Sequence, residues 1–256
     1  IHDGKLWGRG VLDDKGPIIG SIFALKAIRD LGLPIDRRIR VLFGTDEETG
    51  STCVEHYVEH GYEMPTIGFT PDGDFPLIFF EKGMTHCTVG GKVTDKGNIE
   101  VEYFGGGIAP NVVTPTCKLI TKGELKVAET DGVTVKYEDG KTVVEAVGLG
   151  AHGSMPELGV NAAVKLLNAV KDNDFGGDFA RYMNFILDKI GTEVHGESFG
   201  IHFVDEETGE TSLNLGVIRT KGENVDIAFS LRSSKKDSKE ELSKDVCEHL
   251  KQAGAQ

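Results

Sequence analysis

The chain has 256 residues, of which 39% are hydrophobic and 27% are charged, as is ordinary for a soluble globular protein with one or two cored domains. Its net charge of −13 excludes a nucleic-acid backbone as a partner, and no apolar run approaches the roughly 18–20 residues that span a bilayer. The four cysteines lack CxxC spacing and favour reduced thiols, so we expect a cytoplasmic protein without a membrane partner.

The first 80 residues alternate between helical and strand-like segments. A hairpin arm is expected over residues 1–10, turning at Asp3-Gly4. Apolar residues recur at a spacing of about 3.6 in the helical segments, whereas RIRVLFG and TIGFT are short and apolar, like strands of a covered parallel sheet. The helices are expected over residues 18–31 and 51–60, and the strands over residues 38–44 and 66–70. We therefore predict that residues 1–80 form part of an α/β domain with a mostly parallel sheet, which is incomplete here.

After about residue 80 the pattern changes to strands and hairpins. The segments Glu138-Asp139-Gly140 and Lys221-Gly222-Glu223 lie between alternating stretches, as is typical of hairpin turns. Ser238 precedes Glu241 by three residues, a capping-box pattern that predicts the start of a last helix. Strands are expected over residues 84–93, 98–104, 133–137, 141–147, 212–219 and 224–231, and further helices over residues 159–171 and 178–190. We predict for residues 81–256 an α+β domain of two hairpin-plus-helix units.

Carboxylates gather where the predicted strands end. Glu47 and Glu48 follow the strand at 38–44, Asp72 follows the strand at 66–70, and Asp13 stands just before the first helix. If these strands are parallel neighbours, the carboxylates meet at the edge where open α/β sheets place ligands. Converging carboxylates repel one another unless protons or cations intervene. Two divalent ions about 3.5–4 Å apart would satisfy them, so the pattern predicts a two-metal site.

Each acidic signal also has a structural alternative. Asp13 or Asp14 could cap the first helix. Thr45 and Glu48 match a capping box, and Asp72 within Pro-Asp-Gly could be a turn residue. The shared placement of these groups at strand ends favours the metal site over the separate structural explanations.

Three motifs, GRGVLDDKGP, GTDEETG and TPDGDFP, together resemble the co-catalytic zinc peptidases that include aminoacylase, carboxypeptidase G and carnosinase. Their DDKGP and GTDEETG versions are most similar to the bacterial PepV-type (Xaa-His) dipeptidases. By this resemblance Asp13 would bridge two zinc ions, and Glu48 and Asp72 would each be a terminal ligand of one. Glu47 would be the general base that takes a proton from a metal-bridging water and passes it to the leaving amine. The resemblance implies that residues 1–80 belong to the metal-binding catalytic domain and residues 81–256 to its lid domain.

The second domain carries three further candidates. His152 lies in the glycine-rich segment GLGAHGSMPELGVNA and could be a surface residue, but the resemblance implies a lid histidine that stabilises the oxyanion. Asn111 could be an ordinary turn residue; the resemblance implies that it holds polar groups of the substrate. Arg232 could form a surface ion pair; the resemblance implies a bidentate clamp on the substrate's free carboxylate.

The pattern of this family also needs two histidines that the sequence lacks. One stands in an HxD motif well before GRGxxDDKG, and His2 lies too close to Asp13 to take that place. The other stands late in the chain, after the lid. Because zinc sites made of carboxylates alone depart from the usual preference for nitrogen ligands, we hypothesise that the chain is a central fragment, inactive by itself, that lacks the return to the catalytic domain.

The leading interpretation is a metal-dependent dipeptidase that hydrolyses short peptides with a free N-terminus. Two alternatives stay open: an N-acyl amino acid deacylase of the same family, and a non-catalytic metal-binding relative. Zinc is the expected metal, although manganese or cobalt would also suit the carboxylates. A lid with two hairpin-plus-helix units could supply His152 within one chain, which favours a monomer over a homodimer, with a dipeptide substrate as the partner.

Overall fold

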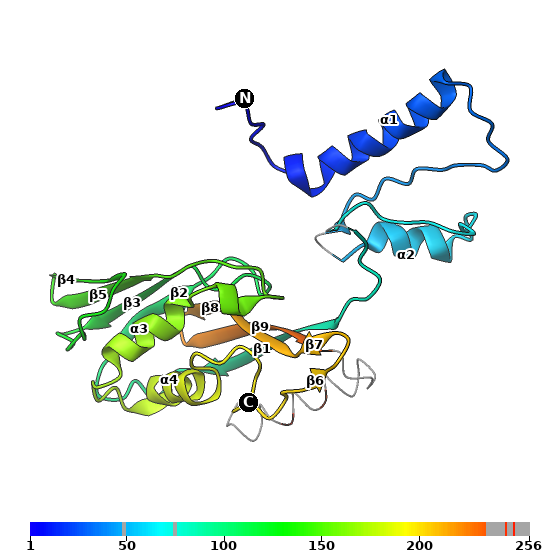
Figure 1. Ribbon diagram of the computed structural model, residues 1–256. Coiled ribbons are helices and arrows are strands. Elements are labelled where there is room, and N and C mark those ends of the chain that lie inside the picture. The colour runs from blue at the N-terminus through cyan, green and yellow to red at the C-terminus, as the bar shows by residue number, and fades with distance from the viewer. Residues whose placement is uncertain (48–49, 74–75, 234–243, 245–247, 249–256) are drawn as a thin grey trace. The chain divides into compact units, whose positions relative to one another are not determined.

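The chain forms two compact units, Ile1–Phe79 and Phe80–Gln256, in a computed structural model (Figure 1). The structure describes residues 1–47, 50–73, 76–233, 244 and 248. We call the first the N-terminal unit and the second the sheet unit; their assignment as catalytic and lid domains stays a prediction. No helix in the described ranges is both long and apolar enough to cross a membrane.

The N-terminal unit contains two α-helices close to their predicted ranges. Helix α1 spans Gly16–Asp30 and follows a π-helical turn at Val11–Lys15, and helix α2 spans Thr52–Glu59. At the start of the chain, His2 and Lys5 form an isolated antiparallel bridge across the predicted turn. The helices and this first turn therefore follow from local sequence signals.

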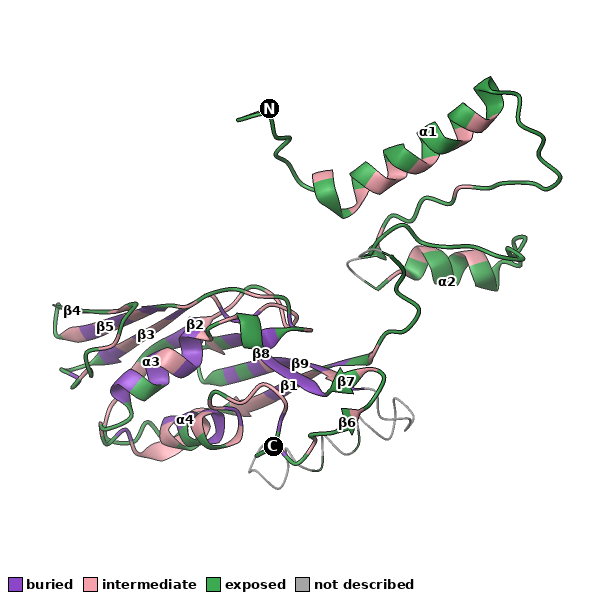
Figure 2. Ribbon diagram, in the orientation of Figure 1, coloured by how far each residue is buried: buried purple, intermediate pink, exposed green. Residues whose placement is uncertain are grey.

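The predicted parallel sheet of the N-terminal unit is wrong for the described residues. None of residues 38–44 or 66–70 belongs to a strand, and large apolar side chains in both segments are exposed, including Phe43 at 57% and Phe69 at 86%. An extended segment becomes a strand only when a neighbour takes up its backbone N–H and C=O groups. No described segment of this unit provides such a neighbour, and none of its described residues is buried (Figure 2).

A seven-stranded sheet organises the sheet unit, in the order β1-β9-β8-β2-β3-β5-β4 (Figure 1). All its described pairings are antiparallel. The strands are β1 (Gly83–Lys92), β2 (Val101–Gly106), β3 (Thr116–Lys122), β4 (Val133–Glu138), β5 (Lys141–Val147), β8 (Ser212–Lys221) and β9 (Asn224–Ser233). Two short strands, β6 (Val204–Asp205) and β7 (Gly209–Glu210), pair separately. This unit therefore combines an antiparallel sheet with helices, as expected for an α+β arrangement.

Both predicted hairpins are confirmed, β4–β5 and β8–β9. The predicted helices correspond to α3 (Ala162–Val170) and α4 (Gly177–Lys189). Strand β3 was missed, although its sequence TCKLITK alternates buried and less buried side chains as a strand should. The last helix, expected from Ser238, begins outside the described residues.

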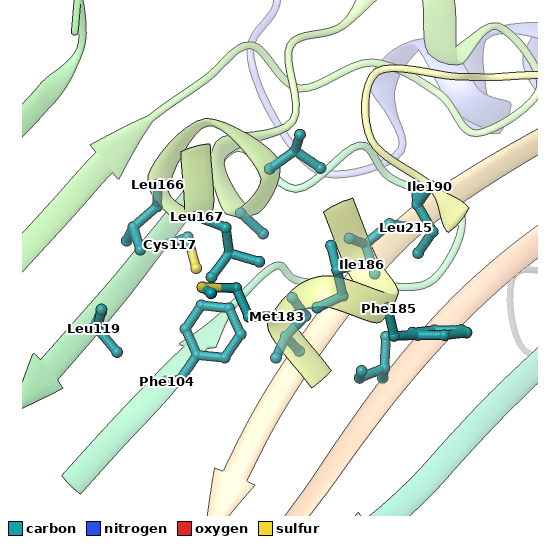
Figure 3. Close-up of a cluster of buried hydrophobic side chains, with 14 of the residues drawn as sticks. Phe104, Cys117, Leu119, Leu166, Leu167, Met183, Phe185, Ile186, Ile190 and Leu215 are labelled. Carbon is teal, nitrogen blue, oxygen red and sulfur yellow. The ribbon is translucent and has the colours of Figure 1, made fainter. Parts of the chain in front are cut away.

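The core of the sheet unit lies between one face of the sheet and helices α3 and α4. Alternate residues of β9 are buried on this face: Val225, Ile227, Phe229 and Leu231. The ring of Phe104 from β2 meets that of Phe179 from α4 edge-on, with ring centroids 5.4 Å apart. Figure 3 shows Leu166 and Leu167 of α3 in the same cluster as Met183 and Ile186 of α4. Each fully buried side chain of this size stabilises the fold by roughly 1.5–3 kcal/mol, so this face of the sheet is held by its packing against α3 and α4.

Candidate active site

Asp13 lies in the turn that leads into α1. Its backbone is extended, with φ −117° and ψ 98°, and the N-cap residue of α1 is Lys15, which makes no side-chain capping bond. The alternative that Asp13 or Asp14 caps this helix is therefore wrong. Instead, the Oδ1 atom of Asp14 is buried without a hydrogen-bond partner among the described residues. A buried carboxylate oxygen in this state is costly unless a cation or a donor approaches it.

Asp46 performs the capping that the sequence suggested for Thr45 and Glu48. Its carboxylate accepts hydrogen bonds from the backbone N–H groups of Thr52 at 2.8 Å and Cys53 at 3.1 Å, in the first turn of α2. Hydrogen bonds from Cys53 and Thr52 lower the pKa of Asp46 to about 2. Of the three consecutive acids, Asp46 therefore has a structural role, the catalytic role expected for Glu47 stays a prediction, and Glu48 lies outside the described residues.

The predicted metal ligands do not form a metal site within the described structure. Asp13 and Asp72 are both described, yet no three His, Cys, Asp or Glu side chains in the described ranges lie close enough to hold an ion. A zinc site normally has four ligands and prefers nitrogen or sulfur atoms among them. The unpaired oxygen of Asp14 is the observation that favours a cation near Asp13, but the described donors alone do not complete a site.

The sheet unit carries a polar face opposite its core. Along β9, Ser230 and Arg232 alternate with the core residues and so lie on the other side of the sheet. The facing residues are Asn214 on β8 opposite Ser230, and Ser212 opposite Arg232. Residues directly opposite one another in an antiparallel pair share a face, so this part of the sheet presents hydroxyl, amide and guanidinium groups.

A loop crosses this face next to a bulge in β8. The register of β8 against β9 shifts between Leu215 and Val217, and a Cβ atom on Gly216 would lie 2.4 Å from the carbonyl oxygen of Pro110. Position 216 must therefore be glycine for the loop at Pro110 to come this close to β8. The side chain of Asn214 donates to the same Pro110 oxygen at 2.7 Å, which fixes the loop that carries Asn111.

A second loop, which carries His152, is tied to the same strand. Ser212 Oγ donates to the carbonyl oxygen of Gly153 at 3.3 Å. Asn161 caps the N-terminus of α3 by accepting from Ala163 N–H at 3.0 Å, while its own Nδ2 donates to Leu215 O at 2.8 Å. The segment GLGAHGSMPELGVNA therefore has a structural explanation: its asparagine starts α3 and anchors the loop to β8.

The structure brings the three candidates of the sheet unit together. Gly153 N–H donates to the carbonyl oxygen of Asn111 at 2.7 Å, and Val112 and His152 form a β-bridge. Arg232 Nη2 lies 3.5 Å from His152 Nε2, a long hydrogen bond. The surface ion pair considered for Arg232 is not among the described contacts. Asn111, His152 and Arg232 therefore lie on one polar surface of a single unit.

Both ring nitrogens of His152 lie near a polar group of the sheet unit. A guanidinium group has no acceptor, so Nε2 presents its lone pair in its contact with Arg232. The neutral imidazole then carries its proton on Nδ1, which lies 2.6 Å from Ser154 Oγ. In this state His152 is oriented from both sides, with a cation at the nitrogen that faces the polar surface.

Two buried polar atoms on the same face have no hydrogen-bond partner among the described residues: Ser230 Oγ and Arg232 Nε. His86, on the neighbouring strand β1, shares this face and is directly opposite Ser230. The pKa of His86 is lowered by its partial burial and then by the positive charge of Arg232. Ser230 and Arg232 therefore have hydrogen-bonding groups without a described partner, and Arg232 adds a positive charge. These properties suit an anionic or carbonyl-bearing ligand.

The sequence analysis identified Asn111, His152 and Arg232 but missed His86 and Ser230. The proximity of these two residues follows from the β1–β9 pairing, which joins segments more than a hundred residues apart. The alternation of β9 could have placed Ser230 beside Arg232. The register of β1 could not have been read from the sequence.

The sequence was compared with models of protein families and with curated proteins, and the two comparisons agree. The model of peptidase family M20/M25/M40 matches residues 1–217. YtjP of Bacillus subtilis (strain 168), whose name marks it as a candidate dipeptidase, is 31% identical over an alignment 250 residues long, gaps included, which covers 91% of this chain and 53% of the relative. A similarly named protein of Staphylococcus saprophyticus is 32% identical over 235 residues, covering 85% of this chain and 50% of its own.

The chain spans about half the length of the curated relatives it matches. Among solved structures, the aminoacylhistidine dipeptidase of Vibrio alginolyticus is similar at 14% identity and a TM-score of 0.26. The match covers 71% of this chain and 40% of that protein's chain. The family match and the relatives confirm the resemblance that the three acidic motifs indicated. The chain belongs to peptidase family M20/M25/M40.

Proposed function

We propose that the full-length protein is a metal-dependent dipeptidase that hydrolyses short peptides with a free N-terminus. Family membership and the names of the relatives support a peptidase acting on dipeptides. The observation that carries the proposal is the gathering of Asn111, His152 and Arg232 on one surface, with Arg232 Nη2 3.5 Å from His152 Nε2. This surface offers a carboxylate clamp beside a group that can stabilise an oxyanion.

In this proposal Asp13, Glu48 and Asp72 would hold two divalent ions, and Asp13 would serve both of them. Zinc is the first choice, and manganese or cobalt the alternatives. When bound, such ions lower the pKa of a water molecule and polarise a carbonyl group. Because these carboxylates do not complete the site among the described residues, the proposal requires further nitrogen ligands from the full-length protein.

The residues of this chain would divide the reaction between them. Glu47 takes the proton from the attacking water and returns it to the leaving amine. His152 donates a hydrogen bond to the oxyanion, Asn111 holds polar groups of the substrate, and Arg232 binds its free carboxylate through two parallel N–H donors. For His152 to donate from Nε2, that nitrogen must first lose its contact with Arg232, which a carboxylate bound to Arg232 would bring about.

A comparison of blocked and unblocked substrates tests this proposal. The full-length protein with zinc is expected to cleave alanyl-histidine and to leave N-acetyl-alanyl-histidine intact, and a chelator should abolish the cleavage. If only the blocked compound is cleaved, the protein is a deacylase and the dipeptidase proposal fails. Metal binding without turnover of either compound would identify a non-catalytic relative. In solution we expect a monomer located in the cytoplasm, since one lid could supply His152 in cis.

A further inference from the structure

The polar face of β1 and β9 carries a histidine that the proposed mechanism does not use. His86 of β1 lies directly opposite Ser230 of β9, and Arg232 lies directly opposite Met84. His86 and Arg232 are therefore diagonal neighbours on one face of the sheet, a relation that sets residues about 7–8 Å apart. Both have long side chains, whereas Ser230 between them is small.

This spacing suits one carboxylate group held between two donors. Charge-assisted N–H···O bonds measure roughly 2.7–2.9 Å, and each carboxylate oxygen can accept two such bonds, so an imidazole at the diagonal position can reach an oxygen of the carboxylate that the guanidinium group holds. The guanidinium of Arg232 supplies a permanent charge. The imidazole of His86 supplies a second donor, and a second charge when it is protonated.

The side chain of His86 is close enough to the positive charge of Arg232 to be affected by it. Its partial burial and the charge of Arg232 are the two causes that lower its pKa. No carboxylate among the described residues offsets that charge at His86. A carboxylate bound between the two side chains would reverse this balance and favour the protonated imidazole.

A separate observation concerns two unsatisfied polar atoms at the same place. Arg232 Nε and Ser230 Oγ are both buried without a hydrogen-bond partner among the described residues. Leaving such groups unsatisfied costs roughly 1–3 kcal/mol each, so native structures usually retain them for a reason. Here both atoms belong to the face that also carries His86.

We propose that His86 and Arg232 together hold one carboxylate, beside the hydroxyl of Ser230, and that this subsite takes the carboxyl end of a peptide or an amino acid. The identity of the ligand as a peptide end rests on the proposed dipeptidase function. The role of His86 is new to that function: it binds substrate and makes carboxylate affinity depend on pH. Affinity should rise as the pH falls through the titration of His86, because the imidazolium form binds the anion more tightly.

Histidine NMR of the 256-residue chain tests the subsite directly. The Cε1–H signal of His86 is followed against pH, alone and with L-alanine as a carboxylate probe; alaninamide, which lacks the carboxylate, is the control. We expect the pKa of His86 to lie below that of an ordinary histidine, to rise with L-alanine, and to stay unchanged with alaninamide. Equal shifts with the two compounds, or none with L-alanine at saturation, would overturn the proposal.

Variants separate the contribution of each group. His86→Gln should weaken L-alanine binding about tenfold, the loss expected for one hydrogen bond to a charged group. Arg232→Met should raise the pKa of His86 in the free chain and remove its response to L-alanine. His202→Gln is the matched control, because this histidine bonds Glu210 instead, with Nε2 2.9 Å from Oε2. Unchanged binding in His86→Gln would limit the subsite to Arg232 and refute the role of His86.

The outcome is independent of the test of the dipeptidase proposal. A full-length protein without peptide turnover could still show the His86 response to a carboxylate, in which case the subsite stands and its ligand is not a dipeptide substrate. Conversely, the full-length His86→Gln variant could cleave dipeptides normally, with an unchanged KM from pH 5 to pH 8. In that case the dipeptidase proposal would stand and the proposed role of His86 would be refuted.

Discussion

Thr121 and Ser230 each bury a hydroxyl group that lacks a hydrogen-bond partner among the described residues. Thr121 lies on β3, among the alternate residues that face the core, so its hydroxyl is surrounded by apolar groups and serves no ligand. Ser230 lies on the opposite face of the sheet, beside Arg232 and His86. An unsatisfied hydroxyl group therefore only destabilises the fold at Thr121, whereas at Ser230 it has a proposed role in binding.

Replacing Thr121 with valine should stabilise the sheet unit. The change removes a buried hydroxyl that makes no bond and keeps the branched shape, so the free energy of unfolding should increase by about 1 kcal/mol. Urea denaturation monitored on the sheet unit measures it. The matched variant Ser230→Ala should also gain stability but bind L-alanine more weakly, whereas Thr121→Val should bind it unchanged. A loss of stability in Thr121→Val would mean that its hydroxyl has a partner, such as an ordered water.

At the scale of elements, helix α2 and strand β8 show how local anchors position the candidate residues. Asp46 is anchored to α2, because its carboxylate accepts hydrogen bonds from the first turn of the helix. Strand β8 is tied to the two candidate loops at its bulge through Thr114, Asn161 and Asn214. Each anchor joins a loop residue or a loop backbone atom to a helix or strand.

The anchor at α2 should depend on acid pH. Since the pKa of Asp46 is lowered to about 2, its stabilising effect is fully present above its ordinary pKa and is lost as the pH falls through the folded value. The amide proton shifts of Thr52 and Cys53, which report the folded state, should therefore titrate with a midpoint near pH 2. In Asp46→Asn the same shifts should not titrate near this pH. Titration of the wild-type signals near pH 4 would show that the capping bonds do not form in solution.

The bulge of β8 should be intolerant of a side chain. In Gly216→Ala the new Cβ would lie 2.4 Å from Pro110 O and 2.5 Å from Ala109 O, both backbone atoms that cannot turn aside. We expect a loss of roughly 1–3 kcal/mol in unfolding free energy and a displaced Asn111 loop. Gly20→Ala is the control with the opposite sign, measured as the helix content of α1, because a Cβ there meets nothing within 4 Å and alanine favours helix by about 1 kcal/mol. Equal stability of Gly216→Ala and wild type would contradict the close approach.

These elements also show what the sequence could predict. The hairpins β4–β5 and β8–β9 and helices α1 to α4 follow from period and turn signals, because those signals are local. The prediction of parallel strands at 38–44 and 66–70 was wrong, because a strand forms only with a hydrogen-bonded neighbour. The apolar pattern of a segment does not identify that neighbour. In the same way, motifs identified Asn111, His152 and Arg232, whereas His86 depends on the distant register of β1 against β9.

At the scale of the whole molecule, the two units differ in how much they bury. The sheet unit holds a continuous core between its sheet and α3 and α4. The N-terminal unit has no buried residue in its described ranges, and Trp7, Phe23 and Phe43 are all more than half exposed. Exposed apolar surface of this extent is characteristic of a region that packs against further protein.

The two units should therefore differ in hydrogen exchange. Isolated helices of the length of α1 and α2 are marginal in water, so their amide protons should exchange at nearly unfolded rates in the 256-residue chain. Amides of β3, β5 and β8 should be protected by orders of magnitude, because they open only with the core. Exchange measured by mass spectrometry with peptide resolution distinguishes the units. Similar protection of α1 and β5 would show that the N-terminal unit has a core of its own.

The central claim is that this family member is a dipeptidase whose general base is Glu47. The most direct measurement is the turnover of alanyl-histidine by the zinc-loaded full-length protein, wild type against Glu47→Gln, with metal content determined on the same samples. We expect kcat to fall by about a hundred- to ten-thousandfold, the range that a general base contributes, with zinc retained; Glu55→Gln, an exposed glutamate of α2, should leave kcat unchanged. Wild-type turnover in Glu47→Gln, or an equal loss in Glu55→Gln, would contradict the account.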